Sequence, residues 1–326
     1  MVRGVLRGPL WLAQVATSTK SFEDNGILGS RRLNDAGLHA MRVKLAHRIA
    51  TRRRRRLAGA VADVHREEFD RNGFVRVENF LPGALFASLH DELLHARVCC
   101  KEKREGDTLM RKIAIDKELL HQAPAVARAV ESIGESGLIS YVGARRDRPV
   151  TYVQSIFQRP GGHSVDPQTR LHADSFHPTV KAWLFLTDVA VGEGAFTYVP
   201  GSHRLTPARL AWERAKSGDA RTSSDLETRE GSPRVSEAEL VTLGLPPPQE
   251  VAVPANTLVV ADTFGFHRRG TSTGPSQRVE VWSIGPRSPF LPSQTLDRWL
   301  VRATRKVDPS EWTTRDDVCA FDPPSE

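Results

Sequence analysis

Short apolar segments separated by turns dominate the chain from residue 150 onward. Residues 150–157 alternate between two faces, whereas residues 183–186 form an uninterrupted apolar run typical of a buried strand. β-Branched and aromatic residues continue at 196–199 and 256–267, and alternation returns at 278–282. These patterns predict strands, and we expect one large domain built mainly of β-sheet.

Helical periodicity marks the first part of the chain. Residues 36–61 place four apolar side chains on one helical face, which we expect to pack against the domain: Leu38, Met41, Leu45 and Ile49. Shorter elements are predicted further on: helices at 67–71, 85–96 and 117–130, a strand at 74–77, and an exposed charged loop at 97–107. We expect these helices to lie outside the sheet.

Composition is that of an ordinary globular protein, with 39% apolar and 26% charged residues in 326. Three cysteines provide neither a disulfide framework nor a zinc-binding spacing, so we expect a cytoplasmic protein. The basic opening segment, residues 1–16, has too short an apolar core for a convincing secretory signal. No run is long enough to predict a transmembrane helix.

A net charge of +7 is concentrated in the first third, where five consecutive arginines follow the apolar helix: Arg52, Arg53, Arg54, Arg55 and Arg56. The simplest interpretation is a solvated basic helix that packs on the domain through its apolar face. A basic amphipathic helix could instead lie on an anionic membrane surface as a peripheral contact. Nucleic acid is the weakest alternative, because no aromatic residues alternate with the arginines to stack on bases.

Two polar residues just before the apolar run at 183–186 predict a metal site. His172 and Asp174 are two apart, so on extended backbone both side chains point the same way. Such a pair alone is more often a surface salt link, but His267, at the end of the strand-like run, could supply a third ligand. Two imidazoles and one carboxylate are typical of non-haem Fe(II) oxygenases. His177 is an alternative to His172, although its odd spacing from Asp174 points it elsewhere.

Arg278 follows His267 after a segment of turn-forming residues, 270–276. A hairpin centred on Ser272 and Thr273 would place Arg278 opposite His267 across a strand pair. The guanidinium could then bind the far carboxylate of a dicarboxylic acid in bidentate fashion.

Five segments in this order resemble the phytanoyl-CoA dioxygenase family of Fe(II)/2-oxoglutarate oxygenases: 69–82, 172–174, 181–183, 194–203, and His267 with Arg278. The resemblance extends over roughly residues 67–290 as an alignment by eye. It implies a double-stranded β-helix (a jelly roll, cupin-like), with Fe(II), the co-substrate 2-oxoglutarate and dioxygen. Ala173 departs from the family, in which glutamine is common at that position, and this bears on substrate analogy more than on metal binding.

The resemblance also implies roles for individual residues. His172, Asp174 and His267 would bind the metal, Arg278 would hold 2-oxoglutarate, and Trp183 would pack beside it. Gln154 is a further candidate for this pocket; the alternative is a surface glutamine on an edge strand. His203 lies in a turn that the family carries without using it for metal, and we expect a structural role for it.

The expected reaction is hydroxylation of an unactivated C–H bond of a small-molecule or lipid-like substrate, with release of succinate and CO2. The carboxylate of Asp174 favours this over halogenation, because halogenating relatives replace it with a small residue. Alternatives are a cupin-like metal-binding module without oxygenase activity, or a peripheral membrane protein. We divide the chain into a basic arm (1–66), the dioxygenase domain (67–300) and a tail (301–326). Residues 213–249 form either a lid or a solvated insertion.

Overall fold

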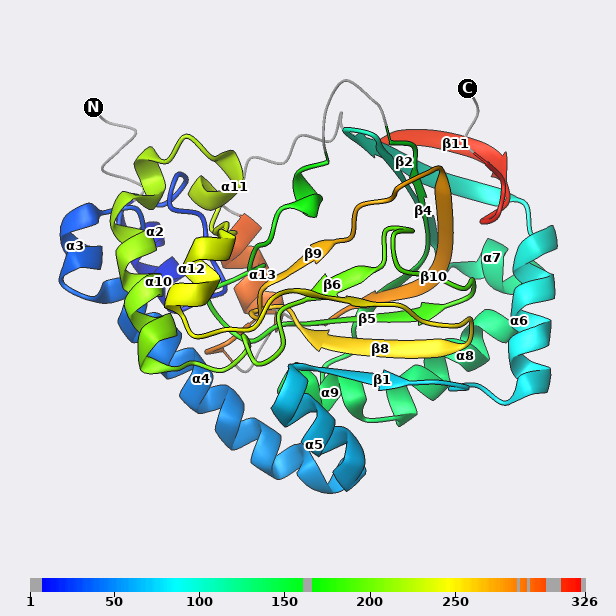
Figure 1. The fold of residues 1–326 in the computed structure, drawn as a ribbon, viewed down its shortest axis with the longest axis horizontal. Helices are drawn as coiled ribbons and strands as arrows, with labels where there is room; N and C mark the ends of the chain where they lie inside the picture. The colour runs from blue at the N-terminus through cyan, green and yellow to red at the C-terminus, as the bar shows by residue number, and fades with distance from the viewer. Residues whose placement is uncertain (1–7, 161–165, 286–287, 292–293, 303–311, 324–326) are drawn as a thin grey trace.

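The computed structural model describes residues 8–160, 166–285, 288–291, 294–302 and 312–323. Its centre is an eight-stranded sheet whose neighbouring strands are all antiparallel, in the order β1-β8-β5-β10-β4-β3-β2-β11 (Figure 1). The bounds are β1 Phe74–Val77, β2 Val98–Glu105, β3 Thr108–Ala114, β4 Val150–Gln158, β5 Val180–Phe185, β8 Thr257–Asp262, β10 Ser276–Ile284 and β11 Thr313–Val318.

A second sheet has three strands in the order β7-β6-β9, namely β7 Gln249–Val251, β6 Phe196–Tyr198 and β9 His267–Arg269. Apolar side chains of both sheets share one core cluster. In it the rings of Trp183 on β5 and Phe196 on β6 lie 4.6 Å apart. The two sheets therefore face each other, which confirms the predicted jelly roll.

Helices cover the opposite face of the large sheet: α6 Gly83–His95, α8 Ala125–Glu135 and α9 Leu138–Val142. Their buried leucines, valines and alanines join the odd-numbered valines of β4 and β10 in the largest core cluster. Successive side chains along these strands therefore point to two different environments. One face of the large sheet is apolar and covered by helices, and the other faces the small sheet. The predicted placement of these helices outside the sheet is confirmed.

Three segments differ from the sequence-based expectations. Residues 97–107, expected to be a loop, contain β2, because Val98, Cys100 and Glu102 point inward from an otherwise charged strand. The helix expected at 117–130 is interrupted at Pro124 and forms α7 Lys117–Gln122 and α8. The run 256–267, expected to be one strand, forms β8 and β9, which lie in different sheets.

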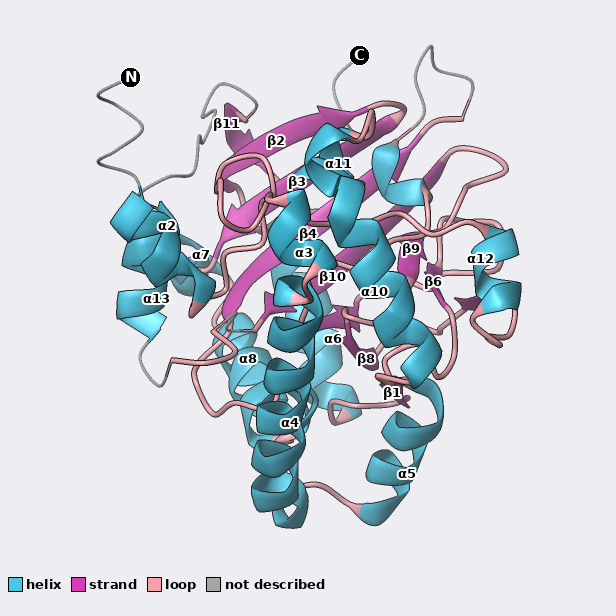
Figure 2. Ribbon diagram, turned by 90° about the vertical axis from the view of Figure 1, so that its left-hand side faces the viewer, coloured by secondary structure: helices cyan, strands magenta, loops and turns pink. Residues whose placement is uncertain are grey.

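The long helix α4, Leu38–Leu57, occurs where the sequence predicts it (Figure 2). The predicted buried face, however, is wrong. Met41 is 59% exposed and Leu45 is 47% exposed. The inward face instead carries His39 and Arg42, together with small apolar residues. His39 contacts Glu213 at 3.0 Å, and Arg42 donates to backbone carbonyls near the N-terminus. Buried polar groups with partners can replace an apolar stripe.

The remaining N-terminal helices are α2 Gly8–Val15, α3 Arg31–Asp35 and α5 Asp63–Asn72. α3 and α4 pack against α10, Pro207–Asp219, and Asn34 donates to the carbonyl of Ser217. The division of the chain at residues 66 and 300 stays a prediction. In the structure α3 and α4, both before residue 66, pack directly on α10, which lies between β6 and β7 in the chain.

Residues 213–249 include the end of α10, the helices α11 Leu226–Arg229 and α12 Glu237–Thr242, and the first residue of β7. Between the two helices the backbone pairs with the predicted metal segment: Ala173 donates to the carbonyl of Pro233, and Val235 donates to that of Leu171. Near the other end of the chain lie α13 Gln294–Arg302 and the edge strand β11.

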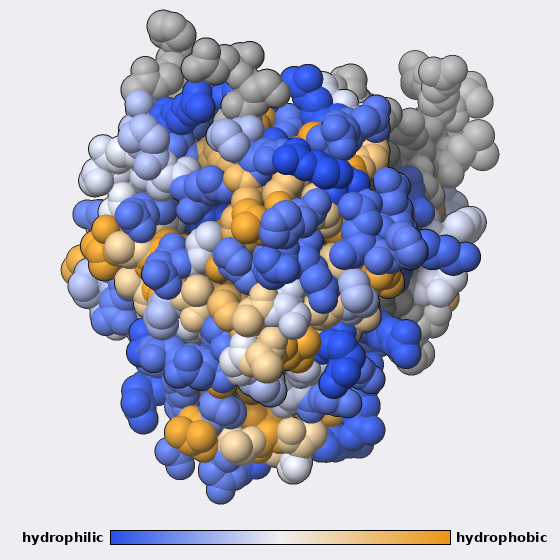
Figure 3. Space-filling view, turned by 90° about the vertical axis from the view of Figure 1, so that its right-hand side faces the viewer, coloured by the Kyte–Doolittle hydropathy of each residue, from blue (hydrophilic) through white to orange (hydrophobic). Residues whose placement is uncertain are grey.

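The face seen in Figure 3 is mostly hydrophilic, with apolar residues dispersed among charged ones. Within the described ranges, no helix combines the length and the apolar character that crossing a membrane requires.

Candidate metal centre

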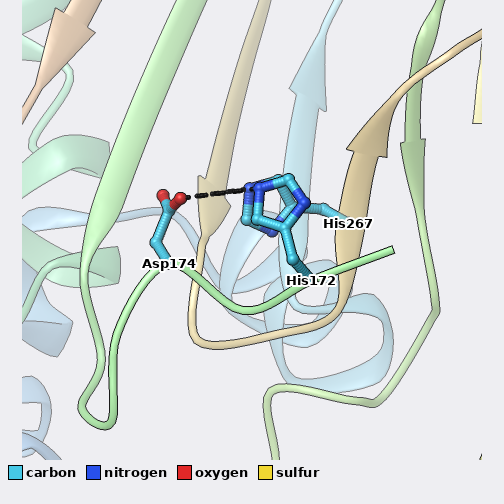
Figure 4. A group of neighbouring side chains, drawn as sticks. All are labelled: His172, Asp174 and His267. Atoms are coloured by element: carbon cyan, nitrogen blue, oxygen red, sulfur yellow. Dashed lines mark ion pairs between the residues drawn. The ribbon is translucent and has the colours of Figure 1, made fainter. Parts of the chain in front are cut away.

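Three side chains from distant parts of the chain converge on one point (Figure 4). The Nε2 atoms of His172 and His267 each lie 3.7 Å from Oδ1 of Asp174. The three potential ligand atoms are all within 4.8 Å of one another. The structure therefore brings together the three residues predicted as metal ligands.

Backbone pairing fixes two of these residues against each other. His172 and His267 form an antiparallel bridge in which each N–H donates to the other's carbonyl at 3.0 Å. The N–H of Asp174 donates to the carbonyl of Thr263 at 2.9 Å. Residues 172–174 are thus not a strand of their own, but they lie locally alongside the segment that ends in His267. Side chains two residues apart can then point the same way.

Hydrogen bonds at the other ring nitrogens determine which tautomer each histidine adopts. His172 Nδ1 lies 2.8 Å from the carbonyl of Arg170, and His267 Nδ1 lies 2.9 Å from that of Gly265. Because a carbonyl only accepts, each Nδ1 must carry the proton. Each Nε2 lone pair consequently faces Asp174, which is the arrangement found in metal-binding histidines.

Burial keeps both imidazoles neutral. It lowers the pKa of His267 to about 4, and the pKa of His172 is lowered by burial and then by the neighbouring His267. Within the described part of the chain, Nε2 of His267 has no hydrogen-bond partner although it is buried. A buried acceptor without a partner is unfavourable. A divalent cation would satisfy it, so the residues present fit a metal ion.

Two lysines contact Asp174, and Oδ1 of its carboxylate faces the two histidines. Its Oδ2 lies 2.7 Å from Nζ of Lys181 on β5, and its backbone carbonyl accepts from Lys20 at 2.6 Å. Neither lysine was singled out as part of the metal site from sequence. Their contact with Asp174 depends on the folding of the N-terminal segment and of β5 around residues 172–174, which no local pattern specifies.

The turn that carries His267 is anchored at its base by Asp262, which is fully buried at the end of β8. Asp262 accepts from the N–H groups of Thr179 and Phe264, and it forms an ion pair with Arg54 at 2.7 Å. Arg54 is thus an inward-facing member of the arginine run. The prediction that treated all five arginines as one solvated group is wrong at this position.

Close packing at the same turn requires a glycine. A Cβ on Gly265 would lie 1.7 Å from the hydroxyl oxygen of Tyr198, whose O–H donates to the carbonyl of Asp262. Tyr198 lies on β6, the strand that pairs with β9, so this contact fixes the turn before His267 against its neighbouring strand. Gly265 also supplies the carbonyl that fixes the His267 tautomer.

Arg278 does not face His267 across a hairpin, as the spacing had suggested. β9 pairs with β6 in the small sheet, whereas β10, which carries Arg278, pairs with β4 and β5 in the large sheet. The turn between β9 and β10 therefore crosses from one sheet to the other. The two residues lie in opposing sheets rather than in one strand pair.

The Arg278 guanidinium is buried and already has partners in the chain. It donates to the carbonyl of Gly194, and its Nε lies 3.4 Å from Oε2 of Glu280, two residues further along the same face. Burial lowers the pKa of Arg278 and raises that of Glu280. Glu280 was not identified from sequence, although its spacing from Arg278 was a usable signal.

The other predicted site residues lie on the same inner face of the large sheet. Gln154 is buried on the central strand β4, not on an edge, and donates to Oε1 of Glu280 at 2.6 Å. Trp183 packs on Phe196 between the sheets. His177 and His203 are buried but lie outside the three-residue cluster.

A comparison with models of known protein families finds one matching family. The model of the phytanoyl-CoA dioxygenase family matches residues 69–240, more than half of the chain, although the match ends before His267 and Arg278. Among curated proteins, none matches the chain.

Several solved structures are similar to this chain. The epimerase SnoN, in complex with Fe3+, alpha ketoglutarate and nogalamycin RO, is 16% identical with a TM-score of 0.45, covering 68% of this chain and 82% of its own. HygX from Streptomyces hygroscopicus, with nickel and 2-oxoglutarate bound, is 19% identical with a TM-score of 0.41, covering 69% and 87%. The carbocyclase SnoK is 20% identical with a TM-score of 0.39, covering 69% and 83%. At these TM-scores the likeness does not bear on function.

The family match and the three-residue cluster come from different observations, one of sequence and one of geometry. Together they confirm the expected cofactors, iron and 2-oxoglutarate. The chain belongs to the phytanoyl-CoA dioxygenase family and is a non-haem iron enzyme that depends on 2-oxoglutarate.

Proposed function

We propose that the chain hydroxylates an unactivated C–H bond of a small-molecule or lipid-like substrate, with conversion of 2-oxoglutarate to succinate and CO2. The observation that carries this proposal is the convergence of two neutral imidazoles and one carboxylate within 4.8 Å. Three ligands on one side of a metal leave positions open for a co-substrate and dioxygen. The carboxylate of Asp174 favours hydroxylation over halogenation.

In this proposal His172, Asp174 and His267 are the metal ligands. The carbonyls of Arg170 and Gly265 hold each imidazole with its Nε2 toward the ion, and Lys181 orients the Asp174 carboxylate. When bound, iron supplies activation of dioxygen. The protein's own contribution is to position the reacting groups and to keep water away from them.

Arg278 is the proposed binding group for the far carboxylate of 2-oxoglutarate, with Trp183 and Gln154 beside it. Its burial supports this role, because charge-assisted bidentate bonds are strongest where water is excluded. The residues from 67 to 300 form the proposed dioxygenase domain.

The test is an assay for succinate released in response to candidate substrates, with Fe(II) and 2-oxoglutarate present. Substrate-dependent succinate and a product heavier by one oxygen atom would support hydroxylation. Substrate-dependent succinate without added oxygen would show a different oxidation. Iron binding without succinate release under any condition would favour the alternative, a cupin-like metal-binding module.

We further propose a peripheral contact with anionic membranes through the outer face of α4. Arg52, Arg55 and Arg56 are exposed there and continue the helical face of Met41 and Leu45, which are exposed as well. Figure 2 shows α4 along the outside of the molecule. Exposed basic and apolar residues on one helix favour an anionic lipid surface.

A further inference from the structure

A buried carboxylate lies beside Arg278 in the proposed 2-oxoglutarate pocket. Glu280 has 0% exposure, with Oε1 accepting from Gln154 at 2.6 Å and Oε2 lying 3.4 Å from Arg278 Nε. Among the described residues, neither this Oε2 nor this Nε makes a hydrogen bond. The contact is therefore an ion pair that neutralises charge while the Arg278 Nε and Glu280 Oε2 atoms stay without a hydrogen bond.

The strand register places Glu280 between Arg278 and the metal cluster. On the inner face of β10, Arg278 is followed by Glu280, Trp282 and Ile284, and Ile284 pairs with Lys181 on β5. Lys181 is the residue whose Nζ contacts Asp174. A dicarboxylate that extends from the metal toward Arg278 would therefore lie along the face of β10 that carries Glu280.

The charge of Glu280 then opposes binding of the 2-oxoglutarate carboxylate at Arg278. The Arg278–Glu280 pair is neutral as a unit, so the far carboxylate of the co-substrate would add an uncompensated buried negative charge. Two carboxylates that share one site do not both stay ionised. The conflict is removed if Glu280 releases the guanidinium and becomes protonated.

We propose that Glu280 is a resident competitor for Arg278: its carboxylate occupies the guanidinium in the free enzyme and is displaced by the co-substrate, with uptake of one proton from solvent. No bond other than the new O–H of Glu280 is formed or broken in this exchange. The inference rests on the proposed role of Arg278 in binding 2-oxoglutarate.

The groups that face Glu280 support the exchange. Gln154 on β4 can remain its hydrogen-bond partner in either state, and Phe185 is its apolar neighbour on β5. Burial already raises the pKa of Glu280, with Arg278 opposing, so loss of the Arg278 contact would raise it further. Proton uptake is thus the expected response to displacement.

Two other cations lie near Glu280. Arg269 on β9 already pairs with Asp166. Lys112 on β3, opposite Gln154, contacts the rings of Trp282, Tyr152 and Trp312, and in the described part of the chain it has no carboxylate partner. Burial lowers the pKa of Lys112 to about 8. At pH 7 Lys112 is already mostly protonated, so it can contribute little proton uptake there.

The experiment is calorimetric titration of 2-oxoglutarate into the full chain, loaded with Ni2+ to prevent turnover, at pH 7 in two buffers of different ionisation enthalpy. For the wild type we expect a buffer-dependent heat that corresponds to uptake approaching one proton. Affinity should fall by up to about tenfold per pH unit where Glu280 is ionised in the free protein. Glu280→Gln, which keeps size and the Gln154 contact, should show no uptake and a pH-independent affinity.

A matched control is Glu102→Gln. Glu102 is also a buried acid paired with an arginine, Arg111, at 2.8 Å, but it lies on the helix-covered face of the same sheet. This variant should retain the proton uptake of the wild type. Lys112→Met should retain it too, and its loss there would assign the proton to Lys112 and overturn the proposal.

The wild-type titration tests the proposal even if Glu280→Gln fails to fold. If the wild type binds 2-oxoglutarate without proton uptake, the proposed role of Glu280 is overturned. Equal uptake by wild type and Glu280→Gln also overturns it, and in both cases the proposed hydroxylation is untouched. Failure of both proteins to bind 2-oxoglutarate would overturn this inference and the proposed role of Arg278 together. If Glu280→Gln binds 2-oxoglutarate and the wild type does not, the role of Glu280 as a competitor for Arg278 is supported.

Discussion

The metal cluster and the Arg278–Glu280 pair are two buried polar groups that differ in whether the chain itself supplies the partner of each charged or polar atom. In the cluster, neutral imidazoles turn their Nε2 atoms toward Asp174, and the buried Nε2 of His267 has no hydrogen-bond partner within the described residues. In the pair, a buried cation and a buried acid neutralise each other. The first group is arranged for a ligand that the chain does not supply. The second already contains a substitute for one.

The difference predicts how each region responds to loss of a side chain. Removing a residue from the cluster should reduce ligand binding more than folding, because the cluster is completed by a metal. Removing one partner of the pair should reduce folding stability as well, because the remaining charge loses its counter-ion and, where it is Glu280, must take up a proton to stay buried.

Asp174→Ala should abolish iron-dependent turnover and weaken metal affinity by more than about 100-fold, because losing only a residue that hydrogen-bonds a metal ligand already costs about 10–100-fold. Anaerobic titration with Fe(II) and 2-oxoglutarate, followed by the visible absorption of the chelate, measures the loss. Urea unfolding of the metal-free variant should differ little from wild type. Retained absorption and turnover would exclude Asp174 as a ligand.

Arg278→Ala should destabilise the protein at neutral pH by up to about 3–5 kcal/mol, because Glu280 loses its counter-ion and must take up a proton to stay buried. It should also weaken 2-oxoglutarate binding by about 30-fold to 1000-fold, as expected for a lost charge-assisted bidentate contact worth about 2–4 kcal/mol. Urea unfolding and calorimetric titration separate the two effects.

The double variant Arg278→Met with Glu280→Leu serves as the control for stability. Removing both charges should recover much of the lost stability without recovering 2-oxoglutarate binding. If Arg278→Ala is as stable as wild type, then the ion pair contributes little and the contrast between the two regions fails.

Arg54→Ala should cost about 3 kcal/mol, near the lower end for a broken buried pair, because the Arg54 side chain is 15% exposed whereas Asp262 is fully buried. Since Asp262 anchors the turn that carries His267, metal affinity should fall too. Arg52→Ala, an exposed neighbour in the same run, should change stability by no more than about 0.5 kcal/mol. Equal effects of the two substitutions would show that Arg54 does not act through Asp262.

The pH dependence of stability tests Glu280 in the free protein. Because burial raises its pKa above 4.5, its contribution to stability is complete below that pH and is lost as pH rises through the folded-state pKa. From pH 5 upward, Glu280→Gln should therefore gain stability relative to wild type, by at most about 1.4 kcal/mol per pH unit. Urea unfolding at several pH values measures this difference, and a constant difference would contradict the assignment.

Charge reversal of Arg52, Arg55 and Arg56 should weaken sedimentation with anionic liposomes by about 1 kcal/mol per residue near the surface. Turnover of a soluble substrate should stay unchanged, because these side chains point away from the cluster. Neutral liposomes provide the control. A large loss of turnover would mean that this face of α4 contributes to the active site.

Most strands and several helices could be predicted because their signal is local. Alternation revealed β4 and β10, and the spacing of His172 and Asp174 required only extended backbone. β2 was missed because charged side chains masked its inward residues. The buried face of α4 was missed because His39 and Arg42 find partners in segments remote in sequence.

The residues along the chain already specify a set that could bind a metal and the family to which the chain belongs. It is the folding of distant segments that brings β9 and β10 into opposite sheets, places Glu280 beside Arg278, and pairs Arg54 with Asp262. The two cases differ because ligand chemistry resides in single side chains. The partner of a buried charge depends on which distant segments close around it, and no spacing along the chain specifies that.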